Sequence, residues 1–121
     1  MRQRCGDRGV EVLGSADVHG GLRERHQEQL YAAIPDDTDV LVTHTPPYGI
    51  LDRDGSILYG SRILLERVRT IRPRLHLFGH IHKSHGTTSD GVTVFSNAAI
   101  MDEGYDNLNV PNVLSLTVSA D

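Results

Sequence analysis

The sequence predicts an α/β fold in which a mixed β-sheet is flanked by helices. Three observations predict it: short apolar runs alternate with two helix-length segments, an Asp-Gly pair marks a hairpin, and Pro or Gly separates the segments. In chain order the expected elements are a strand over 10–15, a helix over 21–34, a strand over 40–44, a helix over 60–71, a strand over 74–82, a hairpin over 87–99 and a strand over 112–118.

The two expected helices differ in their apolar faces. The first has a helical stripe of Leu22, His26, Leu30 and Ala33. The second begins after Ser61, a good N-cap residue, and is closed by Pro73. Its expected face consists of Ile63, Leu64, Arg67, Val68 and Ile71.

The run "VLVTH", residues 40–44, fits a strand that is buried on both faces. Pro46 and Pro47 cannot donate to a sheet ladder, so the strand ends near His44 and gives way to a rigid loop. A helix of the length of residues 60–71 can cross from this strand to a parallel neighbour. Asp90-Gly91 is the strongest hairpin signal in the chain.

Length and composition indicate one domain, residues 1–121, without repeats or a linker. A net charge of -4 and a pI near 5.9 disfavour a broad nucleic-acid platform. The single Cys5 excludes an internal disulfide, and the N-terminus has no apolar signal core. No segment has the roughly 20 apolar residues of a membrane span. We therefore expect a cytoplasmic protein with no membrane contact.

Seven dispersed histidines are the compositional outlier, and four of them lie within "LHLFGHIHKSHG", residues 75–86. In an extended backbone, side chains two apart leave on the same side, so His80 and His82 can share a site after Gly79. Neutral imidazole binds zinc-, iron- and manganese-type ions, and two rings do not saturate one ion. His44, at the end of another strand, is the expected third ligand if the strands are neighbours.

Three other histidines are expected to be structural or solvated. His76 lies inside a strand, where a hydrogen-bonded structural histidine is more common than a ligand. His85 lies in a polar loop, and His26 lies on the polar helix.

The segments "DVLVTHTPPYGILD", "HLFGHIHKSHG" and "SNAA" together resemble the C-terminal half of calcineurin-like metallophosphoesterases, in particular the small metallophosphoesterase-domain proteins. The resemblance implies a partial domain, the C-terminal half of a four-layer sandwich whose two metal ions hydrolyse phosphoesters. It implies that His44 and His80 bind one ion and that His82 binds the other. The implied cofactors are divalent Mn, Zn or Fe.

The chain departs from that family in its N-terminal half, because no Gly-Asp-x-x-Asp or Gly-Asn-His motif precedes His44. The stretch "SADVHG", residues 15–20, has two readings. Either Asp17 and His19 are the family's first metal motif with the middle deleted, or they fall by coincidence in a variable loop. The second reading is favoured, since the flanking strands read as consecutive in these relatives.

Three functions follow as expectations. The first is a metal-dependent phosphoesterase with an incomplete dinuclear site, acting on a phosphoester small molecule or a nucleotide. The second is a non-catalytic metal- or ligand-binding remnant of that fold, and the third is a structural or interaction module. The missing strands leave apolar faces uncovered, which favours a homodimer or a completing partner chain.

Overall fold

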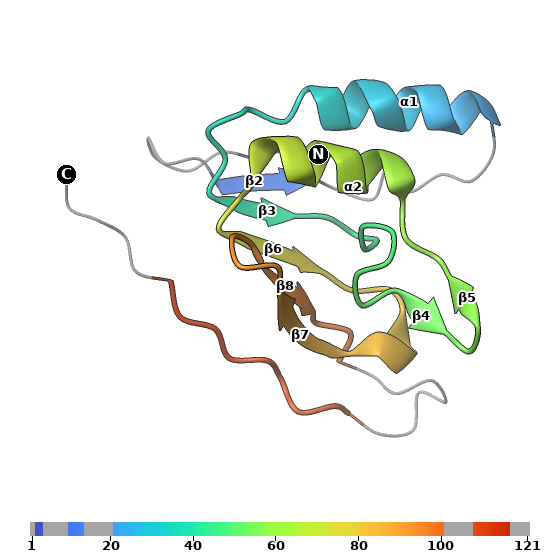
Figure 1. The fold of residues 1–121 in the computed structure, drawn as a ribbon, viewed down its shortest axis with the longest axis vertical. Coiled ribbons are helices and arrows are strands. Elements are labelled where there is room, and N and C mark those ends of the chain that lie inside the picture. Colours follow the sequence, from blue (N-terminus) through green and yellow to red (C-terminus); the bar gives the residue numbers. More distant parts are fainter. Residues whose placement is uncertain (1, 4–9, 14–20, 101–107, 117–121) are drawn as a thin grey trace.

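The computed structural model describes residues 2–3, 10–13, 21–100 and 108–116, with side chains from residue 25 onward (Figure 1). It confirms the mixed sheet with flanking helices. In these described residues, six strands form one sheet in the order β1-β2-β3-β6-β8-β7, and two form a separate ribbon, β4-β5. The strands are β1 (Arg2–Gln3), β2 (Val10–Leu13), β3 (Val40–Val42), β4 (Arg53–Asp54), β5 (Ile57–Leu58), β6 (Leu75–Phe78), β7 (Gly86–Ser89) and β8 (Val94–Asn97).

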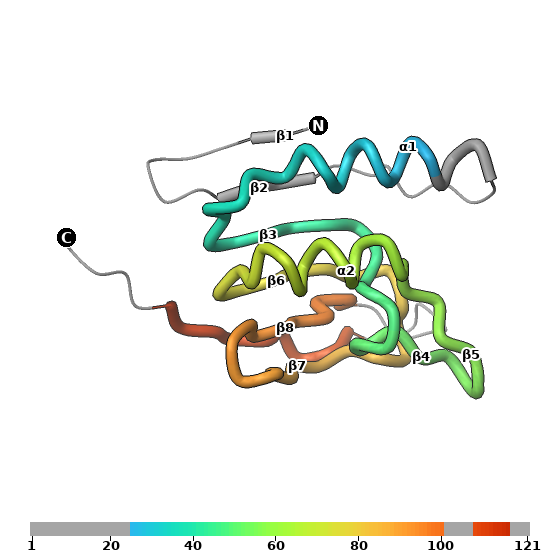
Figure 2. The backbone as a smooth tube through the Cα atoms, turned by 45° about the horizontal axis from the view of Figure 1, so that its top comes forward, coloured from blue at the N-terminus to red at the C-terminus, as the bar shows by residue number. Residues whose placement is uncertain are grey.

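The centre of the sheet is parallel, since β2 pairs with β3, β3 with β6, and β6 with β8 in that sense. Helix α1 (Gly21–Ala32) connects β2 to β3, and α2 (Arg62–Ile71) lies between β3 and β6. Right-handed crossovers that step along the sheet in one direction place both helices on the same face. Figures 1 and 2 show the two helices side by side over the central strands.

The core lies between that face and the helices. Alternation along β6 turns His76 and Phe78 toward the helices and leaves Leu75 and Leu77 half-buried on the other face. The core side chains are Tyr31, Ile34, Leu41, Leu64, Val68, Ile71, Phe78 and Phe95. Full burial of side chains of this kind contributes about 1.5–3 kcal/mol each, which makes this the main layer of the fold.

Helix α2 follows its sequence prediction closely. Ser61 is the N-cap, and its Oγ accepts the Leu64 N–H at 3.1 Å. The side chain of Arg67 reaches across to α1, where its Nε donates to the Tyr31 carbonyl at 2.9 Å and its guanidinium contacts the Ile34 carbonyl. Arg67 therefore joins α2 to two carbonyls, one in the last turn of α1 and one just after the helix ends.

Helix α1 buries a different stripe from the predicted one. Of the predicted stripe, Leu30 packs against the core, whereas His26 and Ala33 are exposed. Tyr31, and Ile34 just after the helix, are fully in the core instead. The aromatic ring and the β-branched chain carry more apolar surface than alanine, so the packing against α2 selects them.

The predicted strand over 112–118 is absent from its described part, residues 112–116. In place of a backbone ladder, the amide nitrogen of Asn112 lies 2.8–3.1 Å from the Gly86 carbonyl, the Ser96 hydroxyl and the Asn97 carbonyl, which share its two hydrogens. Val113 is 90% exposed, so the apolar alternation of this segment does not face a core.

Candidate functional site

The loop after β3 is bent around His44 by its two threonine neighbours. The Thr43 hydroxyl donates to the Thr45 carbonyl at 2.8 Å, and both threonines are buried. Pro46 and Pro47 follow, as the sequence predicts for a strand that ends here. His44 itself is exposed, so the turn presents its ring at the edge of the sheet.

His76 supports this turn from inside the core, where it is 0% exposed. Its Nε2 lies 2.9 Å from the Thr43 hydroxyl. Because that hydroxyl gives its one hydrogen to the Thr45 carbonyl, Nε2 carries the ring hydrogen and donates it. Burial against Phe78 and Phe95 lowers the pKa of His76 to about 3, so the ring is neutral. The sequence prediction of a hydrogen-bonded structural histidine agrees with this position.

The end of β6 differs from the extended backbone that the sequence predicted. The strand ends at Phe78, and His80 has a left-handed φ of 70°. The Ile81 N–H donates to the Gly79 carbonyl at 2.8 Å, which closes a γ-turn with His80 at its centre. His82 then begins a short 3₁₀ helix, η1 (His82–Ser84). His80 and His82 therefore do not alternate along one strand, and that prediction is wrong.

His44 and His80 nevertheless meet, because β3 and β6 are parallel neighbours whose carboxyl ends share one edge of the sheet. The Gly79 N–H donates to the His44 carbonyl at 3.1 Å and extends the ladder to this edge. The centroids of the His44 and His80 rings are 4.8 Å apart, and their planes are tilted by 46°. Both side chains are exposed.

Among the described residues, no three His, Cys, Asp or Glu side chains converge closely enough to hold a metal ion. His82 is half-buried on η1 and does not complete such a group with the ring pair. Asp17 and His19 lie outside the described residues. The role of these side chains as ligands stays a prediction.

The loop from 49 to 60 is organised by the buried carboxylate of Asp52. Its Oδ2 accepts the N–H groups of Gly49 and Gly60, both at 2.8 Å. On the neighbouring ribbon, Asp54 pairs with Lys83 at 3.2 Å. These contacts tie the β4-β5 ribbon to η1 and give both carboxylates structural partners.

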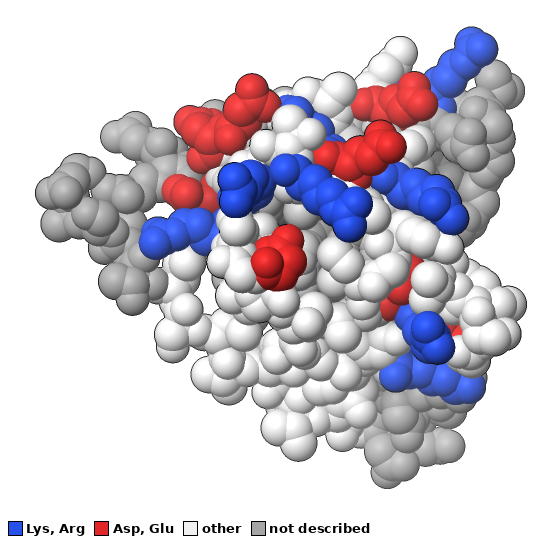
Figure 3. Space-filling model, viewed as in Figure 1, with Lys and Arg blue, Asp and Glu red and all other residues white. Residues whose placement is uncertain are grey.

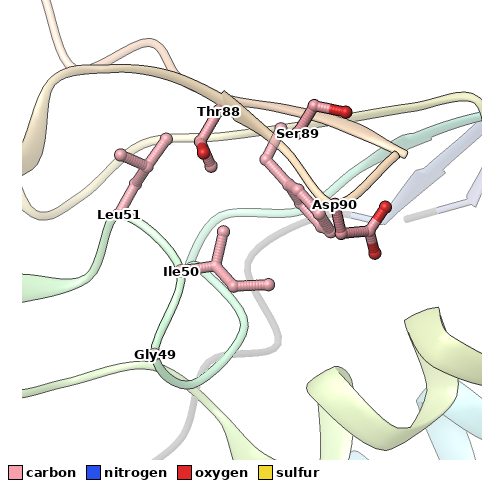
Figure 4. A pocket seen from close by; sticks show the side chains of 7 residues that line it. Gly49, Ile50, Leu51, Thr88, Ser89 and Asp90 are labelled. Carbon is pink, nitrogen blue, oxygen red and sulfur yellow. The ribbon is translucent and has the colours of Figure 1, made fainter. Parts of the chain in front are cut away.

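A pocket of about 340 Å³ lies beside this loop (Figure 4). Ile50 and Leu51 project from the loop toward the end of β7 and the hairpin turn, and Phe95 also lines the pocket. The remaining lining residues are Gly49, Thr88, Ser89 and Asp90. None of the lining residues is a histidine, so the pocket and the ring pair are separate features.

Charge on the helix-covered face is mixed. Figure 3 shows Lys and Arg interleaved with Asp and Glu over α1 and α2. This face therefore carries no broad field of one sign, in agreement with the net charge of -4. Of the described elements, neither α1 nor α2 has the length and apolar character needed to cross a bilayer.

Sequence reasoning missed Asn97, the last residue of β8, whose side chain is fully buried beside the histidine loops. It also missed the positive φ of His80. The stretch "SNAA" follows a strand, which places Asn97 at the correct edge, but no pattern in the sequence gives the partners of its amide.

Known proteins are similar to this chain over much of its length. The family model of calcineurin-like phosphoesterases matches residues 6–84. Metallophosphoesterase domain-containing protein 1 of Homo sapiens is 42% identical over 86 residues, which are 69% of this chain and 26% of that protein. Two proteins of Caenorhabditis elegans are also similar. UPF0046 protein K07C11.7 is 46% identical over 82 residues, 68% of this chain and 28% of that protein.

The second, UPF0046 protein C25E10.12, is 43% identical over 106 residues, 78% of this chain and 38% of that protein. The chain thus spans between 26% and 38% of the length of these three relatives.

Proposed function

Because this chain belongs to the calcineurin-like phosphoesterase family, we propose that it hydrolyses phosphomonoesters or phosphodiesters with divalent metal held at His44, His80 and His82. The observation that supports this most is the contact of the His44 and His80 rings at the ends of two neighbouring parallel strands. The crevice at such strand ends is where ligands bind in α/β sheets.

The geometry of the ring pair fits a shared ion. Two imidazoles that bind one zinc-type ion at about 2.0–2.1 Å from each nitrogen have ring centroids about 5 Å apart. The observed separation is 4.8 Å. Neutral nitrogen ligands suit Zn and Fe and are also found for Mn. His82 is the proposed ligand of a second ion.

A bound divalent ion would neutralise phosphate charge and lower the pKa of bound water. This chain would present the two rings at an exposed edge of the sheet that a phosphoester can reach. Buried polar groups in the core hold the loops that carry the rings. His76 and Thr43 do this for His44. A small phosphoester or a nucleotide is the proposed substrate class.

The remaining ligands are proposed to come from outside the described residues, from Asp17 and His19 or from a second chain. The length of the relatives supports this, since the stretch that matches this chain is only 28% of one C. elegans relative and 38% of the other. The half-buried Val40, Val42, Leu75 and Leu77 on the face away from the helices support a homodimer or a completing partner chain. A cytoplasmic location is part of the same proposal.

A non-catalytic metal- or ligand-binding protein is the second candidate. It is supported by the donor set, which among the described residues offers two adjacent rings and no third metal-binding side chain. Two imidazoles can retain a zinc-type ion weakly, but they supply no negative charge to hold a hard ion such as Mn²⁺.

The test is hydrolysis of bis(p-nitrophenyl) phosphate with Mn²⁺, Zn²⁺ or Fe²⁺, together with metal content by mass spectrometry. We expect metal-dependent turnover. His80→Ala should lower it by about 10²-fold or more, the size of a typical lost catalytic contribution. His26→Ala is the matched control, because His26 is an exposed histidine on α1, an element that carries neither ring of the pair.

The outcomes separate the candidates. Absence of turnover with all three metals would retire the phosphoesterase. Stoichiometric metal without turnover would favour the second candidate, and substoichiometric metal would favour a structural or interaction module. Equal losses in His80→Ala and His26→Ala would mean that the ring pair has no special role.

A further inference from the structure

Three non-glycine residues in the described parts of the chain have a positive φ: Leu51 (50°), Arg72 (55°) and His80 (70°). Arg72 has an ordinary reason, because it is the left-handed cap that ends α2, and its N–H donates to the Val68 carbonyl. Leu51 and His80 end no helix. A left-handed backbone is unfavourable for such residues and persists only where the surroundings impose it.

Both of these positions are tied to one buried amide, the side chain of Asn97, which is 0% exposed. Its Nδ2 donates to the Leu51 carbonyl and to the Ile81 carbonyl, each at 2.9 Å. Its Oδ1 accepts the Ala99 N–H at 3.0 Å. Both amide hydrogens are therefore used, and the oxygen fixes which way the amide faces.

The two carbonyls belong to the two loops that carry the ring pair. Leu51 lies in the loop that follows His44, and Ile81 directly follows His80. The N–H of Ile81 donates to the Gly79 carbonyl, its carbonyl accepts from the buried amide, and its side chain is only 8% exposed. Ile81 is thus held on both sides of its α-carbon, and His80 cannot leave its positive φ without breaking one of these bonds.

We propose that Asn97 is the positioning residue of this site, whose amide holds both loops in strained conformations and thereby keeps the His44 and His80 rings together. β8 is the rigid base for this role, because Asn97 is in parallel register with Phe78 and the Ala98 N–H donates to the Phe78 carbonyl at 2.7 Å. The effect on bound metal rests on the proposed function, whereas the effect on ring geometry does not.

The test replaces the amide by an isosteric carboxyl group. Asn97→Asp keeps the shape and removes both donors, so the Leu51 and Ile81 carbonyls lose their partner. Asn112→Asp is the matched control. Its amide also contacts three acceptors near the end of β8, the Gly86 carbonyl, the Ser96 hydroxyl and the main-chain carbonyl of Asn97, but it does not reach the Leu51 or Ile81 carbonyl.

Two measurements are made on each variant: cross-ring NOEs between His44 and His80 in metal-free protein, and Zn²⁺ affinity by calorimetry. We expect Asn97→Asp to lose the NOEs and to weaken Zn²⁺ binding by about 10–100-fold, the usual effect of removing a group that orients a ligand. Asn112→Asp should keep both the NOEs and the Zn²⁺ affinity, even if its melting temperature falls as far as that of Asn97→Asp.

Retention of the NOEs in folded Asn97→Asp would overturn the positioning role, as would an equal loss in Asn112→Asp. If Asn97→Asp does not fold, Asn97→Ser, which keeps one hydroxyl donor, is compared in the same way. A third outcome separates the two proposals. If the wild-type chain binds no Zn²⁺ and Asn97→Asp still loses the NOEs that the wild type shows, the positioning role is upheld and the result counts against the proposed function.

Discussion

His76 is the residue whose burial has the clearest consequence for stability. It lies in the core with uncharged neighbours, and its Nδ1 has no hydrogen-bond partner among the described residues. The folded protein therefore holds a neutral ring with a pKa of about 3, against 6.5 for the ordinary value. A protonated ring here would be a buried cation without a counter-ion in the part of the chain that the structure describes.

We predict that His76 makes the protein less stable as the pH falls from about 6.5 toward 3. In this range the unfolded chain binds a proton that the folded chain excludes, so the free energy of unfolding decreases by at most about 1.4 kcal/mol per pH unit. His76→Gln keeps an N–H donor near Nε2 and cannot titrate. Urea unfolding across this pH range should show a shallower slope for the variant, and parallel curves would contradict the prediction.

Single residues were only partly predictable from the sequence. His44 and His80 were placed at one edge because strand ends and prolines are visible in the sequence. The positive φ of His80 and the partners of Asn97 were not, because both depend on contacts between segments far apart in the chain. A local pattern contains no information about which distant carbonyl a buried amide will meet.

At the scale of elements, Gly60 controls how closely α2 approaches the loop after β3. A Cβ on Gly60 would lie 2.4 Å from the Pro47 carbonyl oxygen and 2.6 Å from the Tyr48 Cα. These are backbone atoms that cannot rotate away. Two hydrogen bonds keep the segments close: the Ser61 N–H donates to the Pro46 carbonyl, and the Gly60 N–H donates to the buried Asp52 carboxylate.

We predict that Gly60→Ala destabilises the protein by about 1–3 kcal/mol or more, as overpacking against backbone does. Gly79→Ala is the matched control, since its Cβ would meet only Ala99, at ordinary contact distances of 3.8–4.0 Å. Thermal unfolding of both variants measures the difference. Similar melting temperatures for the two would show that the loop moves freely and would refute the prediction.

The sequence predicted elements best where a residue type is strongly tied to one local structure, such as a turn or a helix cap. Asp90-Gly91 gave the hairpin correctly: the Asp90 carboxylate accepts the N–H groups of Val92 and Thr93, and Gly91 has a φ of 92°. Ser61 capped α2 as expected. Prediction failed over 112–116, because alternation alone does not supply a neighbouring strand with free backbone groups.

For the whole molecule, the order of the elements was enough to give the layered fold. Two strand-helix-strand units force parallel pairing and place both helices on one face. Within the described part of the chain no helix covers the other face of β3 and β6, and the side chains of these strands on that face are apolar and half-buried. A sheet face of this kind favours association.

We predict that the chain associates with itself through this face and that Leu77→Lys shifts it toward monomer. The lysine would place a charge in the middle of the apolar patch, where desolvation on association is unfavourable. Ile57→Lys is the matched control, because Ile57 is 53% exposed on the separate β4-β5 ribbon. Sedimentation velocity over a range of concentrations measures the association. A wild-type chain that stays monomeric throughout, or two variants that dissociate equally, would contradict a role for this face.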